Sequence, residues 1–150
     1  MNIHWLVPLE FENNAQIKQC TMASIRLRAG SVLRAINDKN FKLTIGNKIP
    51  KNTQICVIGK IGVKKETISK INDLIEQLEN FNGIKIFDYT DNVLDQDNII
   101  NKYYFKCISL VQYCTCSSQA LKESLQHHYI GPITIINDAI EMPILKPKPI

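Results

Sequence analysis

Two aspartates and an asparagine follow a short apolar run in the segment KIFDYTDN, and they are the residues of this sequence best suited to acid–base chemistry. Asp88 and Asp91 are three residues apart, with Thr90 and Asn92 beside them. Carboxylates placed in this way could take the proton of a hydroxyl group or contribute to a metal site. Aspartates are also common turn and helix-cap residues, so a structural role stays open for both.

Two cations are placed where they could meet an anionic group. Lys60 follows the apolar run of residues 55–58 and Gly59, and Arg26 stands near the start of an expected helix. The carboxyl end of a buried strand is a common place for ligand contacts in α/β proteins, and the guanidinium group of arginine suits phosphate or carboxylate. Both residues are therefore candidate anion contacts. For each, the alternative is an ordinary solvated position on the surface.

Two serines lie inside the segment YCTCSSQALKESLQHHYIGPITIIND. Residues 113–116 and 133–136 have the apolar character of strands, and the leucines between them have helical spacing. The segment therefore has the pattern of a β-α-β unit, which joins parallel strands. Ser117 and Ser118 follow its first strand, so they are candidates for hydroxyls in a binding cleft. They also suit the N-terminal cap of the helix.

The spacing of apolar residues predicts the elements that position these groups. Strands are expected at residues 3–7, 41–45, 55–58, 84–87, 113–116 and 133–136, and helices at 20–37, 65–80 and 96–111, with Gly83 as a left-handed stop after the second. We predict an α/β fold: a single Rossmann-like domain with a mainly parallel sheet of about six strands, flanked by helices on both faces. The domain spans residues 1–142, and the prolines of residues 143–150 indicate an extended tail or interdomain linker.

The composition narrows the class of protein. The chain has 150 residues, 45% of them hydrophobic, as expected of one globular domain. Its net charge is +4, but the lysines are scattered and only 7% of residues are aromatic, which argues against nucleic-acid binding. The N-terminal run has neither signal-peptide nor membrane-span character, so we expect a cytoplasmic protein. The five cysteines lack disulfide or zinc-ligand spacing, and no G-x-G-x-x-G or P-loop motif is present, so no metal and no cofactor is expected.

The order of these segments resembles the N-terminal half of a GT-B glycosyltransferase, especially the bacterial enzymes that transfer sugars for lipopolysaccharide and capsule. The resemblance is carried by IHWLVP, ASIRLRA, VIGK, KIFDYTDN and VQYCTCSSQALKESL followed by ITIIND, and it covers nearly the whole chain. The loop PLEFENN replaces the glycine-rich first loop of many relatives. In that family two Rossmann-like domains face each other across a cleft, and the N-terminal one binds the acceptor.

The resemblance implies a function in polysaccharide biosynthesis. This chain would be the acceptor-binding half of an enzyme that transfers sugar from a nucleotide-sugar to a glycan or lipid-linked acceptor. A C-terminal domain would hold the nucleotide-sugar. Peripheral association with a membrane would be compatible with this role. Asp91 would orient or deprotonate the acceptor, while Arg26 and Lys60 would contact anionic groups. The further predicted substrate contacts are Glu10, Phe11, Asp88, Asn92, Ser117 and Ser118. The isolated chain would be inactive. The alternative is a non-enzymatic α/β module that binds a small anionic ligand or a protein partner.

Overall fold

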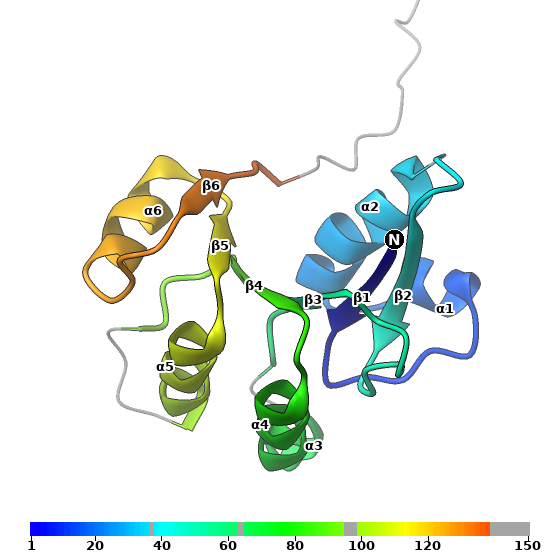
Figure 1. The fold of residues 1–150 in the computed structure, drawn as a ribbon, viewed down its shortest axis with the longest axis horizontal. Coiled ribbons are helices and arrows are strands. Elements are labelled where there is room, and N and C mark those ends of the chain that lie inside the picture. Colours follow the sequence, from blue (N-terminus) through cyan, green and yellow to red (C-terminus); the bar gives the residue numbers. More distant parts are fainter. Residues whose placement is uncertain (37, 63–64, 95–98, 139–150) are drawn as a thin grey trace, which may run out of the picture.

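The computed structural model describes residues 1–36, 38–62, 65–94 and 99–138. They form a six-stranded sheet in which every pairing is parallel, with the strand order β2-β1-β3-β4-β5-β6. The strands are β1 (Asn2–Leu6), β2 (Lys42–Gly46), β3 (Ile55–Ile58), β4 (Ile84–Tyr89), β5 (Tyr113–Cys116) and β6 (Ile133–Ile135). The predicted α/β, Rossmann-like fold with about six strands is confirmed (Figure 1).

Helices lie on both faces of the sheet. The β1–β2 connection contains α1 (Asn14–Lys18), a π-helical segment η1 (Ile25–Ala29) and α2 (Gly30–Ala35); the later connections contain α3 (Lys65–Ile68), α4 (Ile71–Asn80), α5 (Ile99–Leu110) and α6 (Gln119–Gln126). Parallel crossovers are right-handed, and the step from β1 to β2 runs along the sheet in the opposite direction to the steps from β3 to β6. For this reason α2 lies on one face and α3, α4 and α5 lie on the other (Figure 1).

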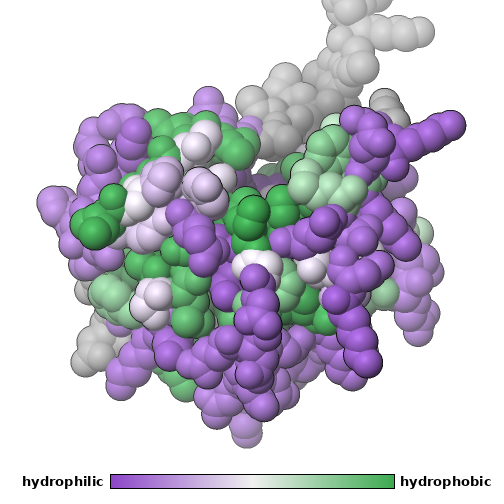
Figure 2. All heavy atoms as spheres, in the orientation of Figure 1, coloured by the Kyte–Doolittle hydropathy of each residue, from purple (hydrophilic) through white to green (hydrophobic). Residues whose placement is uncertain are grey.

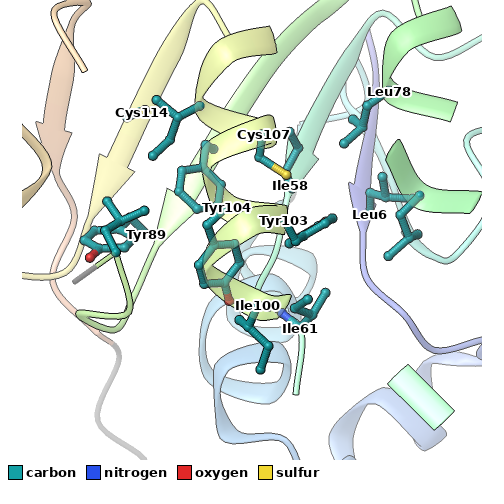
Figure 3. Packing of buried hydrophobic residues seen from close by; sticks show 14 of the residues in the cluster. Leu6, Ile58, Ile61, Leu78, Tyr89, Ile100, Tyr103, Tyr104, Cys107 and Cys114 are labelled. Carbon is teal, nitrogen blue, oxygen red and sulfur yellow. Dashed lines mark hydrogen bonds between the residues drawn. The ribbon is translucent and has the colours of Figure 1, made fainter. Parts of the chain in front are cut away.

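The core consists of two clusters. Alternate residues of a strand face opposite sides of the sheet, so a sheet covered on both faces needs apolar side chains on both. The larger cluster joins Leu6, Ile58 and Phe87 of the strands to buried side chains of α4, α5 and α6. Figure 3 shows part of it, with aromatic and apolar side chains of α5 packed toward the strands. The smaller cluster is built around Trp5 and the buried side chain of Ile25.

The segment between β1 and β2 differs most from the expected pattern. The predicted helix over residues 20–37 is confirmed only as η1 followed by α2, and α1 lies where a loop was expected. The side chain of Asn13 caps α1 by accepting two backbone N–H bonds, which stabilises so short a helix. In η1 the hydrogen bonds span five residues, so its side chains are rotated relative to a helix of 3.6 residues per turn.

Two further expectations need correction. The predicted helix over residues 65–80 is divided into α3 and α4 by a turn at residues 69–70. Gly83 does not have the left-handed conformation that was expected, because no described glycine has a positive φ. Glycine is required at position 83 by close packing instead, because a Cβ there would lie 2.5 Å from the carbonyl oxygen of Gln54. The predicted start of the third helix, residues 96–98, lies outside the described residues.

The surface is unevenly divided between polar and apolar side chains. In the view of Figure 2 hydrophilic residues cover the lower part, over α3 and α4, whereas hydrophobic residues gather toward the side of β5, β6 and α6. None of the helices in the described part of the chain is long and apolar enough to cross a membrane. The domain end predicted at residue 142 and the tail of residues 143–150 lie outside the described residues.

Candidate functional site

Lys60 and Asp91 meet at the carboxyl ends of two paired strands. β3 and β4 are neighbours in parallel register, so the loops that follow them begin side by side. The Nζ atom of Lys60 lies 2.5 Å from Oδ2 of Asp91, and the two side chains are 32% and 44% exposed. Oγ1 of Thr90 donates a hydrogen bond to the same Oδ2 atom at 3.2 Å. Both of these contacts from described residues fall on the same carboxylate oxygen, Oδ2 of Asp91.

Two buried tyrosines hold these loops. The hydroxyl of Tyr89 donates to Oδ1 of Asn92 at 3.0 Å, and the hydroxyl of Ser124 in α6 donates to the same oxygen at 3.0 Å. The hydroxyl of Tyr104 in α5 accepts a hydrogen bond from the backbone N–H of Ile61 at 3.3 Å. Burial raises the pKa of Tyr104, so its hydroxyl stays neutral. The loops after β3 and β4 are therefore fixed by the core beneath them.

A buried ion pair lies at the end of β4, on the sheet face that α2 covers. Nε and Nη2 of Arg28 donate to Oδ2 and Oδ1 of Asp88 at 2.6 Å and 2.5 Å, and the side chains are 5% and 3% exposed. Oγ1 of Thr115 donates to Oδ1 of Asp88 at 2.6 Å. Burial opposes the charge on Arg28, but its interactions with Asp88 and Asp138 together outweigh that effect and raise the pKa of the guanidinium group. Both oxygens of Asp88 are thus engaged within the chain.

The chain leaves β6 across the same arginine. Nη1 of Arg28 donates to the carbonyl oxygen of Ile136 at 2.8 Å and to Oδ1 of Asp138 at 2.8 Å. The side chain of Asp138 is 51% exposed, in contrast to the buried guanidinium group that it contacts. Through Asp88 and Thr115 the arginine also holds β4 and β5. One side chain of η1 therefore fastens the ends of three strands.

A groove of about 380 Å³ adjoins this cluster on the face of the sheet. Its floor is formed by Trp5, Val57 and Ile86, which occupy matching positions in β1, β3 and β4. Gly59 allows the indole of Trp5 to pack closely against the backbone, because a Cβ at position 59 would lie 2.9 Å from Nε1 of Trp5. The volume is in the range of small-molecule sites. The other lining residues are Leu27, Arg28, Ser31, Val32, Ala35, Asp88, Thr115, Ile136 and Asn137.

A second and wider groove of about 840 Å³ lies between the loop of residues 47–53 and α4. Polar side chains predominate along it, and Gln77 joins its two sides: the side chain accepts from the N–H of Ile49 and donates to the carbonyl oxygen of Asn47, both at 2.9 Å. None of the residues predicted for the functional site lines it. The contacts of Gln77 hold the loop that connects β2 to β3.

Three predicted substrate contacts in the N-terminal half of the chain have partners other than Lys60 and Asp91. Glu10 accepts a hydrogen bond from Nδ2 of Asn47 at 3.0 Å, and Phe11 packs against the smaller core cluster. Nη1 of Arg26 donates to the carbonyl oxygen of Cys20 at 2.6 Å. These contacts are all within the chain and hold the segment after β1 in place.

The two serines differ in role. The Oγ atom of Ser118 accepts a hydrogen bond from the N–H of Leu121 at 3.2 Å, so this serine caps α6. Ser117 is partly buried in the turn between β5 and that helix. The structure thus brings Lys60 together with Asp91, places Asn92 in the same loop, and assigns Ser118 the capping role that was its alternative.

Three residues of the site were not predicted: Arg28, Thr115 and Asp138. A signal for the arginine is present in the sequence. Asp88 shares a strand face with Ile86, and this face is turned toward the helical segment between β1 and β2. A carboxylate on an inward face requires a cation on the element that covers it. The arginines of residues 26–34 are the candidates for such a partner.

Comparison with known protein families, with curated proteins and with solved structures found no match to this chain. The glycosyltransferase resemblance therefore stays a prediction. Within the described residues no group of three or more histidine, cysteine, aspartate or glutamate side chains is arranged to hold a metal ion.

Proposed function

We propose that this chain binds the acceptor of a cytoplasmic bacterial glycosyltransferase at the carboxyl ends of β3 and β4. The acceptor would be a glycan or a lipid-linked saccharide, and a separate domain would bind the nucleotide-sugar. The observation that carries the proposal is the Lys60–Asp91 pair, a partly exposed carboxylate beside a cation. Ligands of open α/β sheets bind outside the carboxyl ends of the strands, where this pair lies.

In this proposal Asp91 receives the acceptor hydroxyl. The hydroxyl donates to Oδ1, and the carboxylate takes the proton as the acceptor oxygen bonds to the anomeric carbon of the donor sugar. The bond between that carbon and the nucleotide phosphate breaks, and the nucleoside diphosphate leaves. Lys60 holds the carboxylate at 2.5 Å and offers its remaining N–H groups to an anionic group of the acceptor. Asn92, held by Tyr89 and Ser124, keeps the loop in place.

Acceptor binding can be tested on the chain as it is. We expect oligosaccharides or a polyprenyl-phosphate-linked sugar in detergent to shift the backbone NMR signals of residues 60–62 and 90–93. Asp91→Asn and Lys60→Ala should each weaken binding about tenfold, the effect of losing one hydrogen bond to a charged group. The matched control is Lys106→Ala, which removes a similarly exposed ion pair with Glu79, 2.6 Å long, on α4 and α5.

Equal binding by the two site variants and the Lys106→Ala control would contradict the proposed site. Transfer is a separate question from binding. A chain that binds acceptors at Lys60 and Asp91, yet gives no product with nucleotide-sugars and any donor-binding domain supplied with it, would instead be the non-enzymatic binding module.

A further inference from the structure

The groove beside α2 is lined by an apolar floor and by the buried Arg28–Asp88 pair. We propose that this groove binds a monocarboxylate with an uncharged, apolar body, and that Arg28 holds the carboxylate. The inference concerns different residues from the Lys60–Asp91 pair and does not depend on sugar transfer. Three observations carry it: the fixed guanidinium group, the carboxylate that already contacts it, and the lining of the groove.

The guanidinium group of Arg28 is fixed independently of any ligand. Asp88 engages Nε and Nη2 at 2.6 Å and 2.5 Å, and the Thr115 hydroxyl orients Asp88 in turn. Such fork-to-fork contacts set the plane of an arginine and the direction of its third nitrogen. Nη1 therefore keeps its direction whether or not a further carboxylate is bound. A fixed donor loses little conformational entropy when a ligand arrives.

Asp138 shows where a ligand carboxylate fits. Its Oδ1 lies 2.8 Å from Nη1 of Arg28, although half of its side chain is exposed and the arginine is 5% exposed. The carboxylate thus reaches a buried donor from the solvent side. A free carboxylate can take the same position on Nη1 when Asp138 turns outward. The exchange replaces one charge by an equal one, so it creates no unpaired charge in the buried cluster.

The groove determines what kind of molecule carries that carboxylate. Its floor of Trp5, Val57 and Ile86 is apolar, and its charged lining residues, Arg28 and Asp88, are paired with each other. A second charge on the ligand would find no partner there, whereas an alkyl chain or a ring would be removed from water. Two exposed residues of the sheet, Ile84 and Tyr113, are 44% and 47% exposed and carry the apolar surface beyond the floor along β4 and β5.

Octanoate is a suitable probe, and octanamide is its uncharged counterpart. Trp5 is the single tryptophan of the chain and forms part of the floor, so its fluorescence reports directly on the groove. We expect octanoate to change the emission of Trp5, and we expect Asp138→Ala to tighten octanoate binding about tenfold by removing the internal competitor. The same variant should change octanamide affinity less than twofold.

Two further variants test the position of the ligand. Ala35→Phe fills the groove from an exposed position of α2 and should abolish octanoate binding. Ala120→Phe adds the same ring at an exposed position of α6, away from the lining, and should leave binding unchanged. The proposal is overturned if Asp138→Ala fails to tighten octanoate binding, if octanamide gains as much, or if Ala35→Phe binds octanoate as the unsubstituted chain does.

Discussion

His4 should make the protein lose stability as the pH falls from 6.5 to about 4. The imidazole is 2% exposed in the middle of β1, where Nε2 lies 3.1 Å from the carbonyl oxygen of Gly46 and Nδ1 lies 2.9 Å from Oγ1 of Thr44. A carbonyl only accepts, so we assign the proton of the neutral ring to Nε2, and Nδ1 accepts from the threonine hydroxyl. Burial lowers the pKa of His4 from 6.5 to about 4, against the smaller effect of the Gly46 hydrogen bond.

The direction and size of the effect follow from this pKa. The unfolded chain takes up a proton at His4 near pH 6.5, whereas the folded protein does so only near pH 4. Within this window acid stabilises the unfolded state alone, so the free energy of unfolding falls with the pH. One pKa unit corresponds to about 1.4 kcal/mol, and the interval from 6.5 to about 4 therefore amounts to about 3 kcal/mol. Above and below the window His4 contributes no pH dependence.

Urea unfolding at several pH values between 8 and 4 measures this contribution. The comparison protein is His4→Gln, whose amide can bond to Gly46 but does not titrate. The 14 aspartates and glutamates titrate in both proteins, so the difference between their free energies of unfolding isolates His4. We expect that difference to change by about 3 kcal/mol across the window. A difference that stays constant between pH 7 and pH 4.5 would refute the reasoning.

Two substitutions test the packing at the strand ends. Arg28→Ala leaves Asp88 buried without its cation and should lower the free energy of unfolding, measured in urea, by about 3–5 kcal/mol. Thr115→Val removes one hydrogen bond to the same carboxylate and should lower it by about 1 kcal/mol. Equal losses would mean that the ion pair contributes no more than one hydrogen bond. Gly59→Ala places a methyl group against Trp5 and should cost about 1–3 kcal/mol with a shift in tryptophan emission. An unchanged emission spectrum would show that the indole does not move.

The strands of the sheet were predictable because a short apolar run bounded by turn residues is a local signal. The β-α-β unit that ends the described chain is the clearest case: its strands at residues 113–116 and 133–135 match the expectation to within one residue. The placing of β1 between β2 and β3 has no local signal, because it is decided by pairing between residues far apart in the chain. The helix between β1 and β2 was predicted poorly because η1 departs from the 3.6-residue period on which the expectation rested.

The same limits apply to the candidate site. Lys60 and Asp91 were each predictable as polar residues that follow a strand, and their contact depends on the pairing of β3 with β4. Arg26 was expected to contact an anion because it stands near the start of the helix predicted over residues 20–37. In the π-helical segment Arg28 instead turns toward the sheet and binds Asp88, and Arg26 turns back to the carbonyl of Cys20. Faces of a helix cannot be assigned from a period that the helix does not follow.

The strand order also has a consequence for assembly of the fold. The central pair of β1 and β3 joins Ile3 to Ile55, 52 residues further along the chain, whereas β5 and β6 join Cys114 to Ile133, 19 residues further along. The entropy of closing a loop grows with the logarithm of its length, so the central pairing costs about 0.9 kcal/mol more. Chain entropy therefore favours assembly of the sheet from its C-terminal edge toward its centre, opposite to the direction in which a ribosome releases the chain.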